Sequence, residues 1–151
     1  MEKLKCLECG ATLENVQECR DYLNEMIKWD FEDFNGAGQL HHLTVLCYNL
    51  QHPSTYSPKG LEEAKKSLKD FILKPNSFKE HDMSNRHNLA SNVRDWKITG
   101  TADSHGIYVS KPNWTILASD VVMAGLDNYI ENVKKWSHSV LESLKASGNL
   151  S

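Results

Sequence analysis

Residues 126–144 read LDNYIENVKKWSHSVLESL, and this stretch carries the clearest structural signal in the chain. Its apolar residues return every three or four positions over about five turns, which places them on one face of an α-helix. We therefore predict a long helix after Gly125, with a buried face made of Leu126, Ile130, Val133, Val140 and Leu144. Trp136, at the same spacing, and Trp114 are expected to contribute to the core.

Three more stretches with helical spacing lie in the first half of the chain. The first is expected over about 16–30, after a capping box formed by Asn15 and Glu18. The second is expected from about 39 to His52, where Pro53 disfavours further helix. The third should begin at Ser57-Pro58, an N-cap followed by proline, and end at Lys74-Pro75.

The segment from 76 to 113 is the least periodic part of the chain. It predicts a short helix over 85–94 and extended pieces at 96–99 and 107–109, before a helical start at Ser119-Asp120. No internal repeat or long linker divides the sequence. The predicted fold class is therefore all-α: a single domain over 1–151, in which a cysteine knuckle (1–14) packs on a small helical bundle.

The composition limits the classes of protein to which this chain can belong. The 151 residues carry 17 basic and 20 acidic side chains, and 40% are hydrophobic, enough for one core. No window approaches the roughly 18 apolar residues of a membrane span, and the first residues do not resemble a signal peptide. We expect a soluble, cytoplasmic protein with no membrane or nucleic-acid partner. The partner is then expected to be a small molecule or a protein. Formation of a homodimer is neither favoured nor excluded by the sequence.

The segment Cys6-Leu7-Glu8-Cys9-Gly10 predicts half of a zinc site. Two thiolates separated by two residues can point at one ion, and the glycine lets the chain fold back beneath the sulfurs. A redox pair normally lies between a strand and a helix, and no apolar strand precedes Cys6. A redox pair or two accidental cysteines are the alternatives.

Hairpin geometry indicates the other two ligands. If the first two helices pack antiparallel around a turn near Phe34, Cys19 comes level with Asn49, within one helical turn of His52. The predicted site is Cys6, Cys9, Cys19 and His52, a closed set of the structural kind. His41 or His42 in place of His52 stays open as the fourth ligand. Alternatively, Cys19 is a small buried side chain and His52 interacts with helix-end carbonyls. Cys47 is expected only to pack.

His41 opens a second hypothesis. It falls deep in the predicted helix pair, near Glu25 or Trp29, and a polar site there could also include His42 and Tyr48. A buried histidine bonded to a backbone carbonyl or a tyrosine hydroxyl would fit the same residues. Asp103-Ser104-His105-Gly106 contains triad residue types, but adjacent residues cannot converge as a triad, and we interpret the segment as a turn.

Several motifs together resemble a family of small bacterial proteins classified as a domain of unknown function. They are the Cys6-x-x-Cys9-Gly10 start, the His41-x-Leu43-Thr44-Val45 core and the Tyr48-x-Leu50-Gln51-His52-Pro53 end. Further likeness lies at Trp114-Thr115-Ile116, Asp120-Val121, Lys135-Trp136-Ser137 and Ser139-Val140. Many relatives have proline after the first cysteine, where this chain has Leu7. The resemblance covers most of the chain and implies no particular reaction.

Three functions fit these observations. The first is a zinc-binding helical protein of unknown biochemical role, in which a structural ion supports a binding or regulatory module. The alternative is a metal-dependent enzyme with a polar site around His41, so whether the protein is an enzyme stays open. A nucleic-acid-binding zinc module is weakest, because basic residues are scattered and Glu2, Glu8 and Glu14 flank the knuckle.

Overall fold

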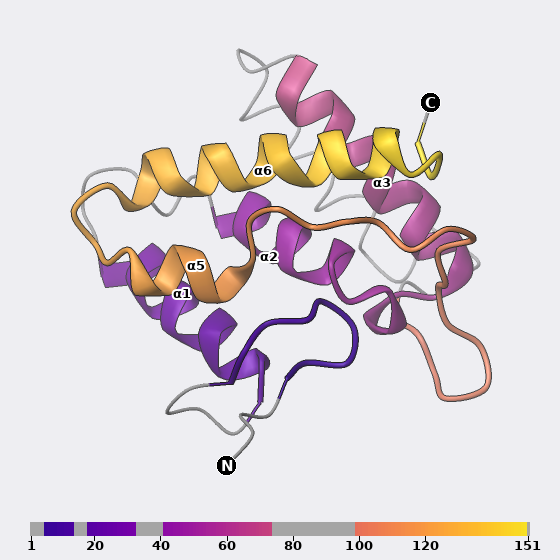
Figure 1. The fold of residues 1–151 in the computed structure, drawn as a ribbon, viewed down its shortest axis with the longest axis horizontal. Coiled ribbons are helices and arrows are strands. Elements are labelled where there is room, and N and C mark those ends of the chain that lie inside the picture. The colour runs from indigo at the N-terminus through magenta and orange to yellow at the C-terminus, as the bar shows by residue number, and fades with distance from the viewer. Residues whose placement is uncertain (1–4, 14–17, 33–40, 74–98, 151) are drawn as a thin grey trace.

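The structure is a computed structural model that describes residues 5–13, 18–32, 41–73 and 99–150 (Figure 1). Its helices are α1 (Arg20–Glu32), α2 (His41–Leu50), the short 3-10 helix η2 (Pro53–Thr55), α3 (Pro58–Leu73), α5 (Ala118–Met123) and α6 (Tyr129–Ala146). Within those ranges there are no strands, only two isolated bridges, Lys5 with Thr12 and Tyr56 with Thr99. The all-α prediction is confirmed. No helix in the described ranges is long and apolar enough to cross a bilayer.

The helix α2 is the centre of the bundle. It packs against α1, α3 and α6, while the short α5 packs against both α1 and α6. Figure 1 shows the long α6 crossing over α2, with the loop of residues 5–13 beside the first turn of α1. Because α2 is covered on several sides, most of its residues are buried, including the polar Thr44. The largest fully buried side chains of the described core are Trp136, Tyr129, Leu23, Met26, Leu50, Leu68 and Leu144.

Helix boundaries mostly agree with the predictions. The Ser57 hydroxyl accepts a hydrogen bond from the backbone N–H of Gly60 at 3.0 Å, so it caps α3 as expected. The helix α2 ends at Leu50, just before His52 and Pro53. At α1 the helix starts later than predicted, at Arg20, and the carboxylate of Asp21 accepts a hydrogen bond from the backbone N–H of Glu18 at 3.1 Å. The predicted cap at Asn15 lies outside the described residues.

The prediction for Leu126 is wrong. Leu126 precedes α6 and is 50% exposed, whereas Val133, Val140 and Leu144 are fully buried as predicted. Gly125 has a φ of 84°, so the chain turns sharply between α5 and α6 and carries Leu126 away from the helical face. Ile130, at the first turn of α6, is only partly buried. Trp136 is fully buried, and Trp114 is partly buried against the core.

The less periodic middle of the chain is described only from Thr99 onward. The predicted helix over 85–94 and the residues 96–98 lie outside the described residues. The predicted extended piece at 107–109 forms no strand, which corrects that prediction. Apolar residues at Ile107 and Val109 suggested a strand, but both side chains are exposed, so no sheet or core draws them into one.

The loop over 99–108 packs directly on the turn that follows α2. The backbone N–H of Gly100 donates to the Thr55 carbonyl at 3.1 Å, and that of Gly106 donates to the Tyr56 carbonyl at 2.7 Å. A Cβ atom on Gly100 would lie 2.5 Å from the Tyr56 carbonyl oxygen, so only glycine allows this approach. The Tyr108 hydroxyl donates to the Leu50 carbonyl at the end of α2. These hydrogen bonds fix the turn after α2, which carries His52, against the loop over 99–108.

Candidate metal centre

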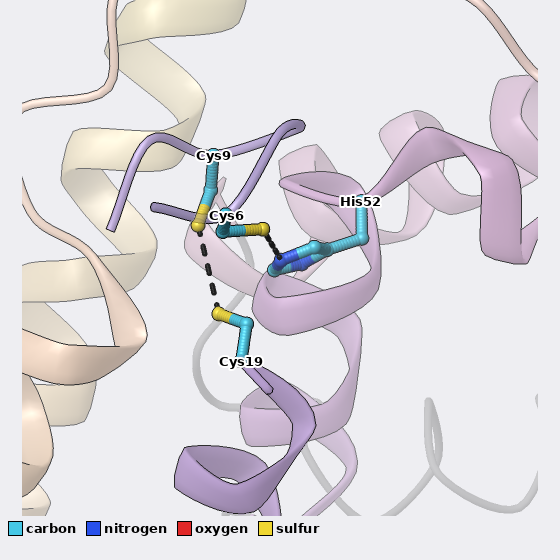
Figure 2. Close-up of side chains that lie close together, drawn as sticks. All are labelled: Cys6, Cys9, Cys19 and His52. Atoms are coloured by element: carbon cyan, nitrogen blue, oxygen red, sulfur yellow. Dashed lines mark hydrogen bonds between the residues drawn. The ribbon is translucent and has the colours of Figure 1, made fainter. Parts of the chain in front are cut away.

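Four side chains from three separate segments converge at one end of the α1–α2 pair (Figure 2). Cys6 and Cys9 come from the N-terminal loop, Cys19 lies one residue before α1, and His52 lies two residues after α2. Their candidate ligand atoms, three Sγ and one imidazole nitrogen, all lie within 4.8 Å of one another. The structure thus brings together the four residues that the sequence singled out, in a cluster that could hold a metal ion.

Backbone hydrogen bonds shape the loop that carries Cys6 and Cys9. The N–H of Gly10 donates to the Cys6 carbonyl at 2.9 Å, and the N–H of Cys6 donates to the Ala11 carbonyl at 2.8 Å. Gly10 has a φ of 85°, in the left-handed region that favours glycine. Leu7, at the tip, is 94% exposed.

Two side-chain contacts fasten the described part of the cysteine knuckle (residues 5–13) to the bundle. The Tyr22 hydroxyl of α1 donates to the Thr12 carbonyl at 2.9 Å. The Glu8 carboxylate accepts two hydrogen bonds from Ser54, one from its backbone N–H at 3.1 Å and one from its hydroxyl at 2.5 Å. The knuckle is therefore tied to α1 on one side and to η2 on the other.

The orientation of His52 presents one particular nitrogen to the sulfurs. Its Nδ1 lies 2.6 Å from the Tyr48 carbonyl oxygen, and because a carbonyl only accepts, Nδ1 carries the proton. Nε2, on the opposite side of the ring, lies 3.4 Å from Cys6 Sγ. The Tyr48 ring stacks on the imidazole with 4.1 Å between centroids. A histidine that ligates a metal is held in the same way, by a carbonyl on its other nitrogen.

Two of the distances between ligand atoms are close to those around a tetrahedral zinc ion. Zinc bonds of about 2.3 Å to sulfur and 2.0–2.1 Å to nitrogen at tetrahedral angles separate the ligand atoms by roughly 3.5–3.8 Å. Cys9 Sγ lies 3.6 Å from Cys19 Sγ, and Cys6 Sγ lies 3.4 Å from His52 Nε2. Of the four residues, Cys9, Cys19 and His52 are buried and Cys6 is half-buried.

The electrostatics of the cluster favour a cation. Hydrogen bonds from the Cys19 and Cys9 thiols stabilise the Cys6 thiolate and lower its pKa, while the same bond to Cys6 keeps the proton on Cys19 and raises its pKa. Burial opposes protonation of His52, but hydrogen bonds to Cys6 and Cys9 outweigh it, and the pKa of His52 rises to about 10. These directions favour negative charge on Cys6 next to the imidazole of His52.

The three residues proposed for a second polar site face different partners. Tyr48 belongs to the surroundings of His52, and His42 lies against the Phe71 ring, 5.6 Å between centroids. His41 Nδ1 lies 3.0 Å from a carboxylate oxygen of Asp30, a partner that the sequence did not predict.

Sequence reasoning missed Asp30 and Tyr129. Asp30 is 1% exposed, and its other oxygen accepts a hydrogen bond from the Tyr129 hydroxyl at 2.6 Å. Asp30 lies four residues after the buried Met26, so it occupies a core-facing position of α1. A carboxylate on an apolar helical face was the available signal, because such a group needs buried partners.

Cys47 lies apart from the cluster. It is fully buried on α2, and burial raises the pKa of its thiol, so it packs as a small apolar side chain as predicted.

Sequence comparison places the chain in a family. The DUF5946 family, described as a family of unknown function, matches residues 4–145, so the chain belongs to it. The match agrees with the resemblance inferred from the cysteine, His-x-Leu-Thr-Val and Gln-His-Pro motifs. No curated protein and no solved structure matches the chain.

Proposed function

We propose that this protein is a zinc-binding helical protein, with one structural zinc ion held by Cys6, Cys9, Cys19 and His52. The observation that carries the proposal is the state of His52: its Nδ1–H is engaged by the Tyr48 carbonyl while Nε2 faces the sulfurs. A cluster of three thiols and one imidazole favours zinc over hard cations such as magnesium, which prefer oxygen ligands.

The donor set favours a structural ion over a catalytic one. Catalytic zinc keeps a position for water or substrate, whereas three sulfurs and one nitrogen fill all four positions. The ion would join the knuckle to the start of α1 and to the turn after α2, segments that are 46 residues apart in sequence at Cys6 and His52. We therefore propose a binding or regulatory module with no chemistry at the ion.

The proposed setting follows from the ligand chemistry. Thiolate ligands require reduced cysteines, which favours a reducing, cytoplasmic compartment. The exposed tip of the knuckle, Leu7, is apolar, which favours a protein or small-molecule partner over a nucleic acid.

Elemental analysis of untagged protein tests the proposal. We expect about one zinc per chain in the wild type, because the described residues contain one group of four candidate ligands. A Cys6→Ser/Cys9→Ser double variant should lose the ion, since two ligands remain. Cys47→Ala is the matched control and should keep it, because Cys47 lies apart from the cluster. Zinc absent from the wild type, or fully retained by the double variant, would contradict the proposal.

A second candidate, metal-dependent chemistry at His41, is favoured by one contact. The buried Asp30 carboxylate fixes the ring of His41, whose side chain is 32% exposed, and carboxylates orient metal-binding and proton-transferring histidines in this way. Titrating zinc-loaded protein with a further equivalent of a divalent metal tests it. Binding that His41→Gln abolishes would support this function, and the lack of a second binding event would contradict it.

A further inference from the structure

Two of the three clustered sulfurs lie in direct contact. Cys9 Sγ of the knuckle and Cys19 Sγ at the start of α1 are 3.6 Å apart (Figure 2). A disulfide bond is about 2.05 Å long, so the two sulfurs would need to approach by roughly 1.5 Å. Rotation of two cysteine side chains, one of them on a turn, supplies a movement of that size without displacing a helix.

The clustered cysteines are also more accessible than the remaining one. Cys6 is half-buried, Cys9 is 8% exposed and Cys19 is 6% exposed, whereas Cys47 has no exposed surface. Oxidation of cysteine follows thiolate character and access to solvent. We therefore expect the three clustered sulfurs to react with oxidants. Cys47, which is fully buried, serves as an unreactive control within the same chain.

We propose that the cluster is an oxidation-sensitive metal site, in which a hydroperoxide converts Cys9 and Cys19 into a disulfide and the ion is released. This inference rests on the proposed zinc site. In the first step one thiolate attacks a peroxide oxygen and forms a sulfenic acid as the O–O bond breaks. The leaving alkoxide, or hydroxide in the case of hydrogen peroxide, takes a proton and leaves as an alcohol or as water. In the second step the other thiolate attacks the sulfenic sulfur, the S–O bond breaks, and hydroxide takes a proton and leaves as water.

The ion leaves because too few ligands remain. The hydroperoxide accepts the two electrons that the thiolates lose, and neither sulfur of the disulfide can ligate zinc as a thiolate. Cys6 and His52 alone cannot supply the four ligands of a structural site. The disulfide would keep the knuckle joined to α1 while the metal link to the turn after α2 is lost.

Hydrogen peroxide added to the zinc-loaded protein tests this inference. We expect zinc release, followed with a chromogenic chelator, in step with a Cys9–Cys19 disulfide found by peptide mapping. Zinc content measured before the peroxide separates the two proposals: protein without zinc overturns the site itself, and zinc retained after peroxide overturns only the switch.

Two matched variants identify the sulfur pair. Cys6→His and Cys19→His each leave two cysteines and two histidines, a set that still suits zinc. Cys6→His keeps the contacting pair, so it should release zinc about tenfold or more faster than Cys19→His, in which the partner thiol is missing. Cys47→Ala should release zinc as the wild type does. Equal release by both histidine variants, or a Cys6–Cys9 disulfide in the wild type, would overturn the assignment.

Discussion

At the scale of single residues, His52 is held at Nδ1 and on one face of its ring. The Tyr48 carbonyl fixes Nδ1–H and the Tyr48 ring stacks on the imidazole, so the ring can present only Nε2 to the sulfurs. Both restraints come from a residue four positions earlier, in the last turn of α2. The ligand is therefore oriented by its own helix before any ion binds, which reduces the entropy lost on binding.

The Tyr129 hydroxyl leads to a prediction about alkaline pH. Burial, with the hydrogen bond to Asp30, raises the pKa of Tyr129, and burial likewise raises the pKa of Tyr56 and of Tyr108. Above about pH 10 the unfolded chain releases phenol protons that the folded chain retains, so the free energy of unfolding should fall as pH rises.

Urea denaturation from about pH 8 to pH 11 measures this effect. Tyr129→Phe should lower stability at every pH, because Asp30 loses a buried donor, and it should also make the decline with pH less steep. A wild-type stability that is flat or rises above about pH 10 would contradict the prediction.

At the scale of elements, the register of α1 against α2 brings together two pairs of polar side chains. Cys19 pairs with His52 at one end of the two helices, and Asp30 pairs with His41 at the other. The two pairs share one midpoint in the sequence, between residues 35 and 36, as expected for an antiparallel pair. The midpoint predicted from the sequence, near Phe34, differs from it by one to two residues. That error left Cys19 and His52 within reach of each other but moved the expected partner of His41 away from Asp30.

The contrast between a buried residue of α6 and a residue in the turn before it gives a prediction about packing. Val133→Ala should cost about 1–3 kcal/mol of unfolding free energy, because Val133 is fully buried and its lost methyl groups leave a void. Leu126→Ala removes more atoms but should cost less, since Leu126 is half exposed in the turn before α6. Chemical denaturation of both variants measures the difference. A larger loss from Leu126→Ala would contradict the described boundary of α6.

Sequence periodicity predicted most helices because their apolar faces meet the core. It failed at Leu126, where a glycine with positive φ interrupts an otherwise continuous pattern. The four candidate ligands could be found from residue type and hairpin geometry. The Asp30–Tyr129 contact could not, because the two residues are 99 positions apart and only the packing of α6 on the first two helices brings them together.

At the scale of the whole molecule, the proposed ion would tie the N-terminal knuckle to the bundle. An ion that binds only the folded state stabilises it by mass action, so a strong chelator should lower the melting temperature. The Cys6→Ser/Cys9→Ser variant, which lacks two ligands, is the control and should not respond to the chelator. Thermal unfolding followed by circular dichroism measures both proteins, and an equal response in both would contradict the metal link.

X-ray absorption at the zinc edge of the purified protein tests the central claim most directly. The proposed site predicts a first shell of three sulfur atoms at about 2.3 Å and one nitrogen atom at about 2.0–2.1 Å, with no open position. Replacing His52 by cysteine should convert that shell to four sulfurs. A first shell of nitrogen and oxygen alone, or a sample without a zinc edge, would contradict the assignment of Cys6, Cys9, Cys19 and His52 as the metal ligands.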